Sequence, residues 1–511
     1  MTRKTEKYRQ RIREAYLADE LQVVTDLLAS FSLGKGERQI ISSNAANLVR
    51  RVRTESTPSM MENFLAQYGL STTEGVALMC LAEALLRVPD SATIDALIED
   101  KIVSGNWQEH LGQSSSSLVN SSTWALLITG KLLENDDREG LVVTLRSLFK
   151  RLGEPVVRKA VGQAMKELGH QFVLGRSIDE ATKRGAKWRK KGYTYSFDML
   201  GEAARTDADA LRYLQAYRDA IEELAATCTS NDIRSNPGIS VKLSALHARY
   251  ESPQRQRVLD ELVPRTLSLA LQAKAANMGF NIDAEEADRL DLSLDVVDAI
   301  LSDERLEGWD GFGVVVQAYG PRARHTIDWL YARAQELGRK IMVRLVKGAY
   351  WDAEIKRAQT LGLNGFPVFT RKVNSDLSFL CCAEKLLGMT DCIYPQFATH
   401  NAHSVAAVQY MAKKNKVVSY EFQRLHGMGE ALYDTVMEVA GCHCRIYAPV
   451  GAHRDLLAYL VRRLLENGAN SSFVNQIVDE RISPDVIAKD PVDLLAHLDT
   501  RFSSSRIAKP A

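Results

Sequence analysis

Short apolar runs alternate with longer helical patterns in the second half of the chain, and this alternation constrains the fold more than any other feature. Eight such runs follow residue 191, each of a length suited to a strand. They span residues 193–199, 239–245, 280–285, 313–319, 341–346, 392–399, 417–423 and 445–450. Strands that alternate with helices are typical of βαβ units and a parallel sheet. Eight units in one contiguous stretch predict a closed (βα)8 barrel of the TIM type.

The regions on either side of these runs complete the predicted organisation. An open doubly wound sheet is disfavoured, because no glycine-rich turn of the dinucleotide or P-loop type follows the first run. Apolar residues recur at helical spacing upstream, for example in residues 78–86 and 124–133. We therefore expect an all-helical arm or linker region at residues 1–150, the barrel at 151–480 and a C-terminal tail or linker at 481–511.

The charge balance is near neutral, with 65 basic and 64 acidic side chains. It gives no overall electrostatic footprint for nucleic acid, so we expect no nucleic-acid partner. Residues 183–191 are rich in lysine and arginine, and we interpret them as a solvated helix face rather than a nucleic-acid or membrane patch. The N-terminus lacks a signal-peptide pattern, and no run of 18 apolar residues occurs. A cytoplasmic protein is expected.

A metal site is not expected from the cysteine pattern. Cys442 and Cys444 flank His443, which at first suggests a pair of metal ligands. Zinc requires three or four protein ligands, and no second pair stands at a usable spacing. The prediction is therefore that the protein holds no metal.

Polar side chains lie within nearly every apolar run or at its C-terminal end. They are Asp198, Lys242, Asp283, Gln317, Arg344, Gln396, Thr399, Glu421, Gln423 and Tyr447. A charged group in a buried strand is costly unless it is paired. Because the C-terminal ends of barrel strands converge on one mouth, where active sites are built, we expect this set to line a site. The alternative is a set of internal ion pairs that satisfy one another across the barrel.

The helix expected at residues 455–467 follows the last strand and ends at Gly468. Four of its side chains share one face, at positions i, i+3, i+4 and i+7: Tyr459, Arg462, Arg463 and Glu466. Two adjacent arginines can be an ordinary surface pair. Just after the last strand of a barrel, they can instead bind a substrate carboxylate with planar, bidentate geometry.

The fifth run continues into a segment that suits an anionic, planar cofactor. Arg344 and Lys347 place positive charge at the end of the strand, and Gly348 permits close approach of the backbone. Two aromatic residues follow, Tyr350 and Trp351. A flavin has both a pyrophosphate that needs cations and a ring whose reduced, anionic form is stabilised by a nearby guanidinium.

Nine segments of the sequence resemble the proline dehydrogenase domain of the bacterial proline utilization A flavoenzymes. They are YSFDMLGEAA, VKLSALHARYE, NIDAEEADRL, VVVQAYGPRA, VRLVKGAYWD, YPQFATHNAHS, YEFQRLHGMGE, RIYAPVG and YLVRRLLENGANSSFV, in family order over residues 190–480. The resemblance implies FAD-dependent oxidation of L-proline to 1-pyrroline-5-carboxylate, the first step of proline catabolism to glutamate. It also implies hydride transfer to the flavin, a membrane quinone as electron acceptor, and peripheral contact with the bacterial inner membrane.

The resemblance also assigns roles to individual residues. It implies a carboxylate clamp of Lys242, Arg462 and Arg463, with Glu202 as the acidic partner of Arg462. It implies catalytic roles for Lys242, Asp283, Arg344 and Tyr447. Tyr350, Leu425 and Tyr447 are the expected walls around the proline ring. The cofactor positions that it implies are Asp283, Gln317, Arg344, Lys347, Gly348, Ala349, Trp351, Thr399, His400, Asn401, Gln423 and Glu466.

Two departures from the larger family members concern partners. We expect neither a ribbon-helix-helix DNA-binding module before the helical region nor an aldehyde dehydrogenase domain after residue 511. The chain is therefore expected to be either a truncated bifunctional protein or a monofunctional relative, with its product passed to a separate or deleted pyrroline-carboxylate dehydrogenase domain. The N-terminal helices resemble the family's arm, which favours a homo-oligomer. No residue stands out as the acceptor of the amine proton.

Two other functional classes stay open from the residues alone. Lys242 and Lys347 allow a lyase or aldolase that forms a Schiff base without flavin. A proline sensor that kept the fold but lost catalysis is the non-enzymatic alternative.

Overall fold

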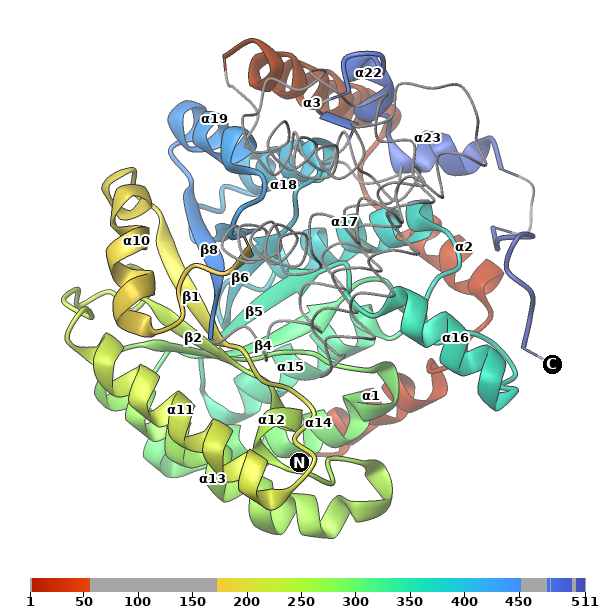
Figure 1. Ribbon diagram of the computed structural model, residues 1–511. Coiled ribbons are helices and arrows are strands. Elements are labelled where there is room, and N and C mark those ends of the chain that lie inside the picture. Colours follow the sequence, from red (N-terminus) through yellow and green to blue (C-terminus); the bar gives the residue numbers. More distant parts are fainter. Residues whose placement is uncertain (1, 56–171, 452–475, 478, 499–501, 511) are drawn as a thin grey trace, which may run out of the picture.

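Eight parallel strands close into a barrel in sequence order, and β8 pairs with β1 (Figure 1). The computed structural model describes residues 2–55, 172–451, 476–477, 479–498 and 502–510. The strands are β1 (Thr194–Met199), β2 (Gly238–Val241), β3 (Gly279–Ile282), β4 (Phe312–Gln317), β5 (Ile341–Val346), β6 (Ile393–Ala398), β7 (Glu421–Leu425) and β8 (His443–Val450). The predicted (βα)8 barrel is confirmed.

The observed bounds differ most from those expected at three strands, and the third ends at Ile282 rather than at residue 285. The second ends at Val241, and the rest of its apolar run forms a short buried helix, α12 (Leu243–Leu246). A buried helix and a buried strand are both continuous apolar runs, so periodicity alone does not separate them. The seventh strand begins at Glu421 rather than at residue 417, and Val418 is 90% exposed in the loop before it.

Helices between the strands form an outer ring around the barrel (Figure 1). The main ones are α11 (Asp207–Ala225), α13 (Arg255–Ala275), α14 (Leu290–Leu301), α15 (Ala323–Leu337), α16 (Trp351–Leu361), α17 (Lys372–Leu387), α18 (Ala402–Lys414) and α19 (Glu430–Ala440). Helix α11 illustrates how they form. Thr206 and Asp209 close a capping box at its start, and Leu214, Tyr217 and Ile221 form its buried face.

The N-terminal segment is helical, as predicted, and packs against the outer ring. It contains α1 (Arg3–Glu14), α2 (Glu20–Ser30) and α3 (Lys35–Glu55), which contact α15, α17 and α18 respectively. Arg9 of α1 is fully buried, forms ion pairs with Asp291 and Asp295, and lies 5.4 Å from the Trp329 ring centroid. The helical patterns at residues 78–86 and 124–133 lie outside the described residues. The predicted domain boundaries stay predictions.

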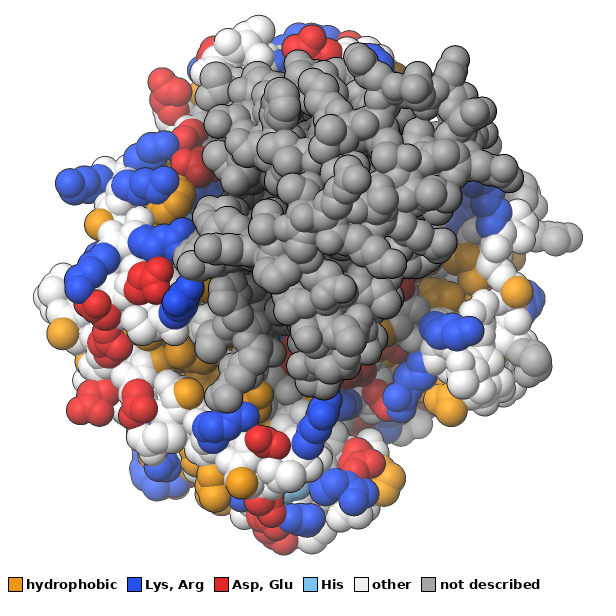
Figure 2. Space-filling view, in the orientation of Figure 1, with side chains coloured by type: hydrophobic (Ala, Val, Ile, Leu, Met, Phe, Trp, Pro, Cys, Tyr) orange, Lys and Arg blue, Asp and Glu red, His pale blue; other side chains and the backbone are white. Residues whose placement is uncertain are grey.

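The C-terminal helices α22 (Pro484–Ile487) and α23 (Pro491–Ala496) pack against α3 and α17. None of the described helices has both the length and the apolar character needed to cross a lipid bilayer. Figure 2 shows basic and acidic side chains interspersed over the described part of one face. On α10 (Ile178–Lys190), Lys183 and Arg184 pair with acids one turn earlier, Asp179 and Glu180. This pairing is typical of a solvated helix face.

A layer of paired polar side chains fills the barrel on the N-terminal side of its mouth. Arg445 of β8 donates to Glu421 of β7 at 2.8 Å, and both side chains are buried. Gln396 and Gln423 also donate to Glu421, at 2.9 and 2.8 Å. Gln396, Glu421 and Gln423 therefore pair with one another inside the barrel, and their expected place in the site stays a prediction. They form the internal pairs of the alternative interpretation.

Candidate active site

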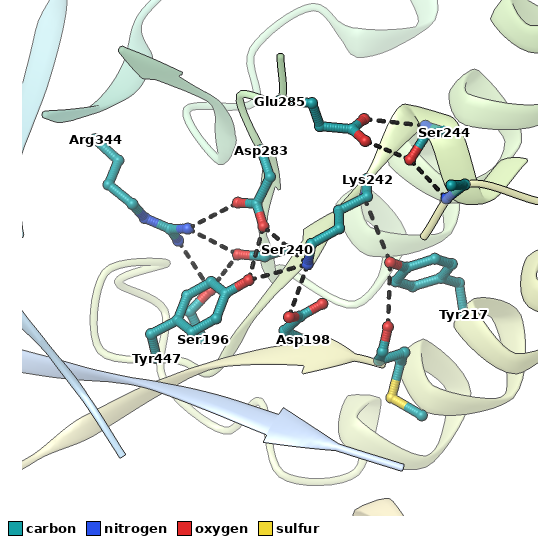
Figure 3. A network of polar contacts seen from close by, with 12 residues as sticks. Ser196, Asp198, Tyr217, Ser240, Lys242, Ser244, Asp283, Glu285, Arg344 and Tyr447 are labelled. Carbon is teal, nitrogen blue, oxygen red and sulfur yellow. Dashed lines mark hydrogen bonds and ion pairs between the residues drawn. The ribbon is translucent and has the colours of Figure 1, made fainter. Parts of the chain in front are cut away.

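A second polar cluster lies at the C-terminal mouth, and Lys242 is at its centre (Figure 3). Lys242 follows the last residue of β2 and is 7% exposed. Its ammonium donates to Asp198 of β1 at 2.8 Å and to the hydroxyl of Tyr447 at 3.3 Å. The ammonium nitrogen also lies 3.4 Å from a carboxylate oxygen of Asp283. The structure thus brings together Lys242, Asp283 and Tyr447, which are far apart in the sequence.

Arg344 of β5 joins this cluster from the opposite side of the barrel (Figure 3). Its guanidinium donates to Asp283 at 3.1 Å. It also donates to the hydroxyls of Ser240 at 2.9 Å and Ser196 at 3.0 Å. The Tyr447 hydroxyl donates to the other oxygen of Asp283 at 2.7 Å. Asp283 therefore binds Arg344 and Tyr447 at once and fixes their relative positions.

The charges of the cluster keep Lys242 protonated. Burial alone would lower the pKa of Lys242, but the nearby Asp198, Tyr447 and Asp283 raise it well above its ordinary value. Burial raises the pKa of Asp198, which is fully enclosed and has one carboxylate oxygen without a partner among the described residues. A buried ammonium at a barrel mouth can bind an anionic group of a ligand, and the adjacent Tyr447 ring offers an apolar contact.

The loop after β5 has the backbone geometry that the sequence suggested. Gly348 has a φ of +141°, which L side chains rarely adopt. A Cβ atom at this position would lie 2.3 Å from the Tyr319 ring, so no larger residue fits without movement. Ala349 and Tyr350 follow in the same loop and are partly exposed. At Gly348 the backbone of the loop, rather than a side chain, therefore lies against the Tyr319 ring.

Lys347 and Trp351 of the same segment have partners within the protein. Lys347 forms an ion pair with Asp376 of α17, which also pairs with Lys372. Although burial alone would raise it, the attraction of the two lysines lowers the pKa of Asp376 to about 2. The Trp351 indole donates to the carbonyl of Phe369 at 2.8 Å. Lys347 therefore has a fixed carboxylate partner on α17.

Three predicted cofactor residues follow β6 and organise the start of α18. The Asn401 side chain accepts the backbone N–H of Ser404 and caps the helix, and Thr399 accepts the N–H of Asn401. His400 accepts the N–H of Leu425 at 3.1 Å, which ties the loop after β6 to the end of β7. These hydrogen bonds fix the backbone between β6 and α18. The cofactor-binding roles of the three residues stay predictions.

The other predicted residues divide into three groups. Leu425 is in register with Tyr447 at the mouth, and Gln317 ends β4. Gln423 lies one layer deeper and donates to Glu421, although its own oxygen has no partner among the described residues. Glu202 lies in the loop after β1. The remaining predicted site residues, Arg462, Arg463 and Glu466, lie outside the described residues.

Sequence reasoning missed the small hydroxyl residues of the cluster. Ser196 and Ser240 hold Arg344, but neither was assigned a role, whereas Asp198, which holds Lys242, was expected at the mouth. Alternation was the available signal, because Ser196 and Asp198 are two residues apart on β1 and therefore share the inner face of the barrel. Asp376 gave no such signal, since it belongs to an outer helix.

A buried carboxyl group lies beside this cluster, on the segment after β3 (Figure 3). Glu285 is 8% exposed and accepts the backbone N–H and the hydroxyl of Ser244. Burial raises the pKa of Glu285 to about 7, although Arg289 and the Ser244 hydrogen bonds oppose this effect.

The raised pKa of Glu285 predicts a pH-dependent stability. A carboxyl pKa raised on folding contributes stability that is present below the unfolded value, near 4.5, and is lost as pH rises through about 7. We expect Glu285→Gln to become more stable relative to the wild type by about 3 kcal/mol between pH 4.5 and pH 8. Denaturant unfolding of both proteins at the two pH values measures this difference. Parallel pH dependences would contradict the prediction.

The barrel and its mouth cluster define the class of protein. It is a (βα)8 barrel whose mouth holds a buried lysine, an arginine and a tyrosine around one aspartate, which is where enzymes of this fold place their chemistry. The family model described as "Proline dehydrogenase" matches residues 181–476, more than half of the chain. This chain belongs to the proline dehydrogenase family.

Relatives of known sequence and structure agree with this assignment. The "Bifunctional protein PutA" of Klebsiella aerogenes is 49% identical over 98% of this chain and 39% of its own length. "Proline dehydrogenase 1" of Bacillus subtilis strain 168 is 25% identical over 64% of this chain and 96% of its own length. A crystal structure of a proline utilization A variant from Bradyrhizobium japonicum has a TM-score of 0.75 and 48% identity, and covers 97% of this chain and 50% of that one. The chain spans about two fifths of the bifunctional relative.

Two further family models match the region before the barrel. The "Proline utilization A proline dehydrogenase N-terminal domain" matches residues 7–53, which contain α2 and most of α1 and α3. The model described as "DNA-binding domain of Proline dehydrogenase" matches residues 60–172. The expectation of no nucleic-acid partner is therefore unsupported and is withdrawn. It rested on overall charge, and overall charge does not report on one region of a chain.

Proposed function

We propose that the protein oxidises L-proline to 1-pyrroline-5-carboxylate with FAD as the cofactor and a membrane quinone as the final electron acceptor. The observation that carries the proposal is the ammonium of Lys242, buried at the barrel mouth among Asp198, Asp283 and Tyr447. A fixed cation next to an aromatic ring suits a small amino acid, which has a carboxylate and, in proline, an apolar ring. The proline dehydrogenases among the relatives support the same substrate.

The residues after β5 fit a flavin dinucleotide. Gly348 has no room for a Cβ, and its positive φ exposes backbone for close contact with a ligand. Arg344 has one guanidinium nitrogen, and Gln423 has one amide oxygen, that are buried and have no partner among the described residues. Buried polar atoms usually find a partner, so these two atoms fit the polar edge of a bound group. Arg344, Lys347 and the Gly348 backbone would hold the cofactor.

When bound, FAD supplies the acceptor for the hydride that leaves the proline ring. The chain's own residues do the rest. Lys242 binds the substrate carboxylate, and Tyr447 packs against the ring. Asp283 fixes Lys242, Arg344 and Tyr447 relative to one another, so the substrate enters a site that is already organised. Arg344 supplies a fixed positive charge on the cofactor side.

The Schiff-base alternative is disfavoured by the charges around Lys242. Attack on a carbonyl needs a neutral amine, which enzymes obtain by lowering a lysine pKa. Here Asp198, Tyr447 and Asp283 raise the pKa of Lys242. Lys347 likewise faces the carboxylate of Asp376. Both lysines are therefore better suited to binding anions than to nucleophilic attack.

The visible absorption spectrum of the purified protein, recorded before and after L-proline is added without oxygen, tests the proposal. We expect a flavin spectrum that bleaches with proline, followed by reoxidation when a soluble quinone is added. D-proline at the same concentration is the control for the substrate. A colourless protein that takes up no FAD would overturn the cofactor assignment, and a bound flavin that proline does not bleach would overturn the substrate assignment.

A further inference from the structure

The loop after β1 is hydrogen-bonded to helix α12 at Ser244. The backbone N–H of Ala203 donates to the Ser244 hydroxyl at 3.0 Å, and the N–H of Ala204 donates to the Ser244 carbonyl at 2.8 Å. Glu202, which precedes these two alanines, is one of the proposed substrate-binding residues. The position of its backbone is therefore set in part by a side chain 42 residues away in sequence.

Ser244 is itself fixed by the buried carboxyl group of Glu285. Its backbone N–H donates to one oxygen of Glu285 at 3.0 Å, and its hydroxyl donates to the other. The Ser244 hydroxyl thus donates to Glu285 and accepts from the backbone N–H of Ala203. Figure 3 shows the contact with Glu285. Ser244 is 3% exposed, so water does not readily replace either bond.

The loop needs this attachment because its backbone is strained. Ala203 has a φ of +49°, which costs an L residue energy that the surroundings must supply. Gly201 has a φ of +148°, and a Cβ there would lie 2.3 Å from the Tyr213 ring. Glu202 lies between these two residues, so its direction follows from a conformation that the free chain rarely adopts.

We propose that Ser244 is a positioning residue for substrate binding, which holds Glu202 in place through the Ala203 backbone and is anchored by Glu285. The inference rests on the proposed function, because it assigns Glu202 to the proline site. Ser244 thereby connects the loop after β1 to the segment after β3, which carries Asp283 and Glu285. Ser244 touches no substrate in this role.

The first test is the Ser244→Ala variant, with anaerobic flavin reduction followed over a range of L-proline concentrations at pH 8. We expect the half-saturating proline concentration to rise about tenfold, since one buried hydrogen bond to a strained loop is lost. The limiting reduction rate should stay within about twofold, because Lys242 and Arg344 keep their partners. Ser244→Thr, which keeps the hydroxyl, should restore most of the affinity.

Ser378→Ala is the matched control, because Ser378 is a serine of similar burial on α17, away from this loop. It should leave the half-saturating concentration unchanged. An unchanged value in Ser244→Ala, or an equal change in Ser378→Ala, would overturn the proposal. The wild-type protein is measured first: if proline does not reduce its flavin, the proposed function fails, whereas the proposal on Ser244 fails only in a protein that proline reduces.

A double-mutant cycle with Glu202 shows whether Ser244 acts through that residue. Ser244→Ala in a Glu202→Gln background should raise the half-saturating concentration by less than about twofold, because the group that Ser244 positions is already impaired. A full tenfold effect in that background would mean that Ser244 acts by another route, such as Lys242 two residues earlier, and would contradict the proposal. If Ser244→Ala does not fold, Glu285→Gln is measured against the same Glu202→Gln background and carries the same expectation.

Discussion

Lys242→Met is expected to abolish most of the proline-dependent flavin reduction while leaving FAD bound. The variant removes the ammonium that is proposed to bind the substrate carboxylate, and it leaves the buried Asp198 without its cation while Asp283 keeps Arg344. The loss of a desolvated charge partner costs 2–5 kcal/mol in comparable complexes, so we expect kcat/KM to fall by roughly a thousandfold. The contacts of Lys242 are with Asp198, Asp283 and Tyr447, not with the loop after β5, so the flavin content should not change.

The matched control for this variant is Lys340→Met. Lys340 is an exposed lysine just before β5, at the opposite end of the barrel, so its loss should leave both flavin content and reduction rate unchanged. Absorbance ratios give the flavin content, and anaerobic mixing gives the rate. A Lys242→Met protein that proline reduces at the wild-type rate would remove Lys242 from the substrate site.

The barrel could be predicted from the sequence because it depends on local signals. Each strand is a short apolar run, each connection has helical periodicity, and the count of eight closes the sheet. The errors arose where those signals are ambiguous. The apolar run after residue 238 continues from β2 into α12, since both are buried, and the apolar run from residue 417 begins in a loop that exposes Val418.

The candidate site was only partly predictable, for a physical reason. Lys242, Asp283, Arg344 and Tyr447 were found because each lies in an apolar strand or just after it, where a charge or a hydroxyl stands out. The partners of Arg344, Ser196 and Ser240, and the partner of Lys347, Asp376, are ordinary residues in the sequence. They acquire a role only when the fold brings segments from distant parts of the chain together, and no local pattern records that.

The depth of a polar residue within the barrel could not be predicted from the sequence either. Glu421 and Gln423 are two residues apart on β7, as Ser196 and Asp198 are on β1. Glu421, Gln423 and Asp198 were therefore all assigned to the mouth of the barrel. The register between β7 and β8 decides which residues lie at the mouth: Gln423 is paired with Arg445, whereas Leu425 is paired with Tyr447. Because the strands are staggered, equal positions along two strands are not at equal depth. The structure therefore separates a structural layer around Glu421 from the mouth cluster around Asp283.

That separation predicts that Arg445→Met will destabilise the protein without altering proline affinity. Arg445 is 3% exposed and donates to Glu421 and to the carbonyls of Tyr195, Asn236 and Arg234. Its removal leaves the buried Glu421 carboxylate without its cation and takes a donor from each of these carbonyls, so the free energy of unfolding should fall by about 4 kcal/mol. Denaturant unfolding measures this loss.

The proline concentration that half-saturates flavin reduction should stay within about twofold of the wild type in Arg445→Met, since Lys242, Asp283 and Tyr447 keep their mutual contacts. A second variant, Arg445→Met with Glu421→Leu, removes both charges and should regain part of the lost stability, because no buried carboxylate is then left unpaired. If Arg445→Met instead weakened proline binding tenfold at unchanged stability, the Glu421 layer would belong to the substrate site. Lys242→Met, in contrast, should impair proline binding itself, so the two variants together locate the boundary between barrel core and active site.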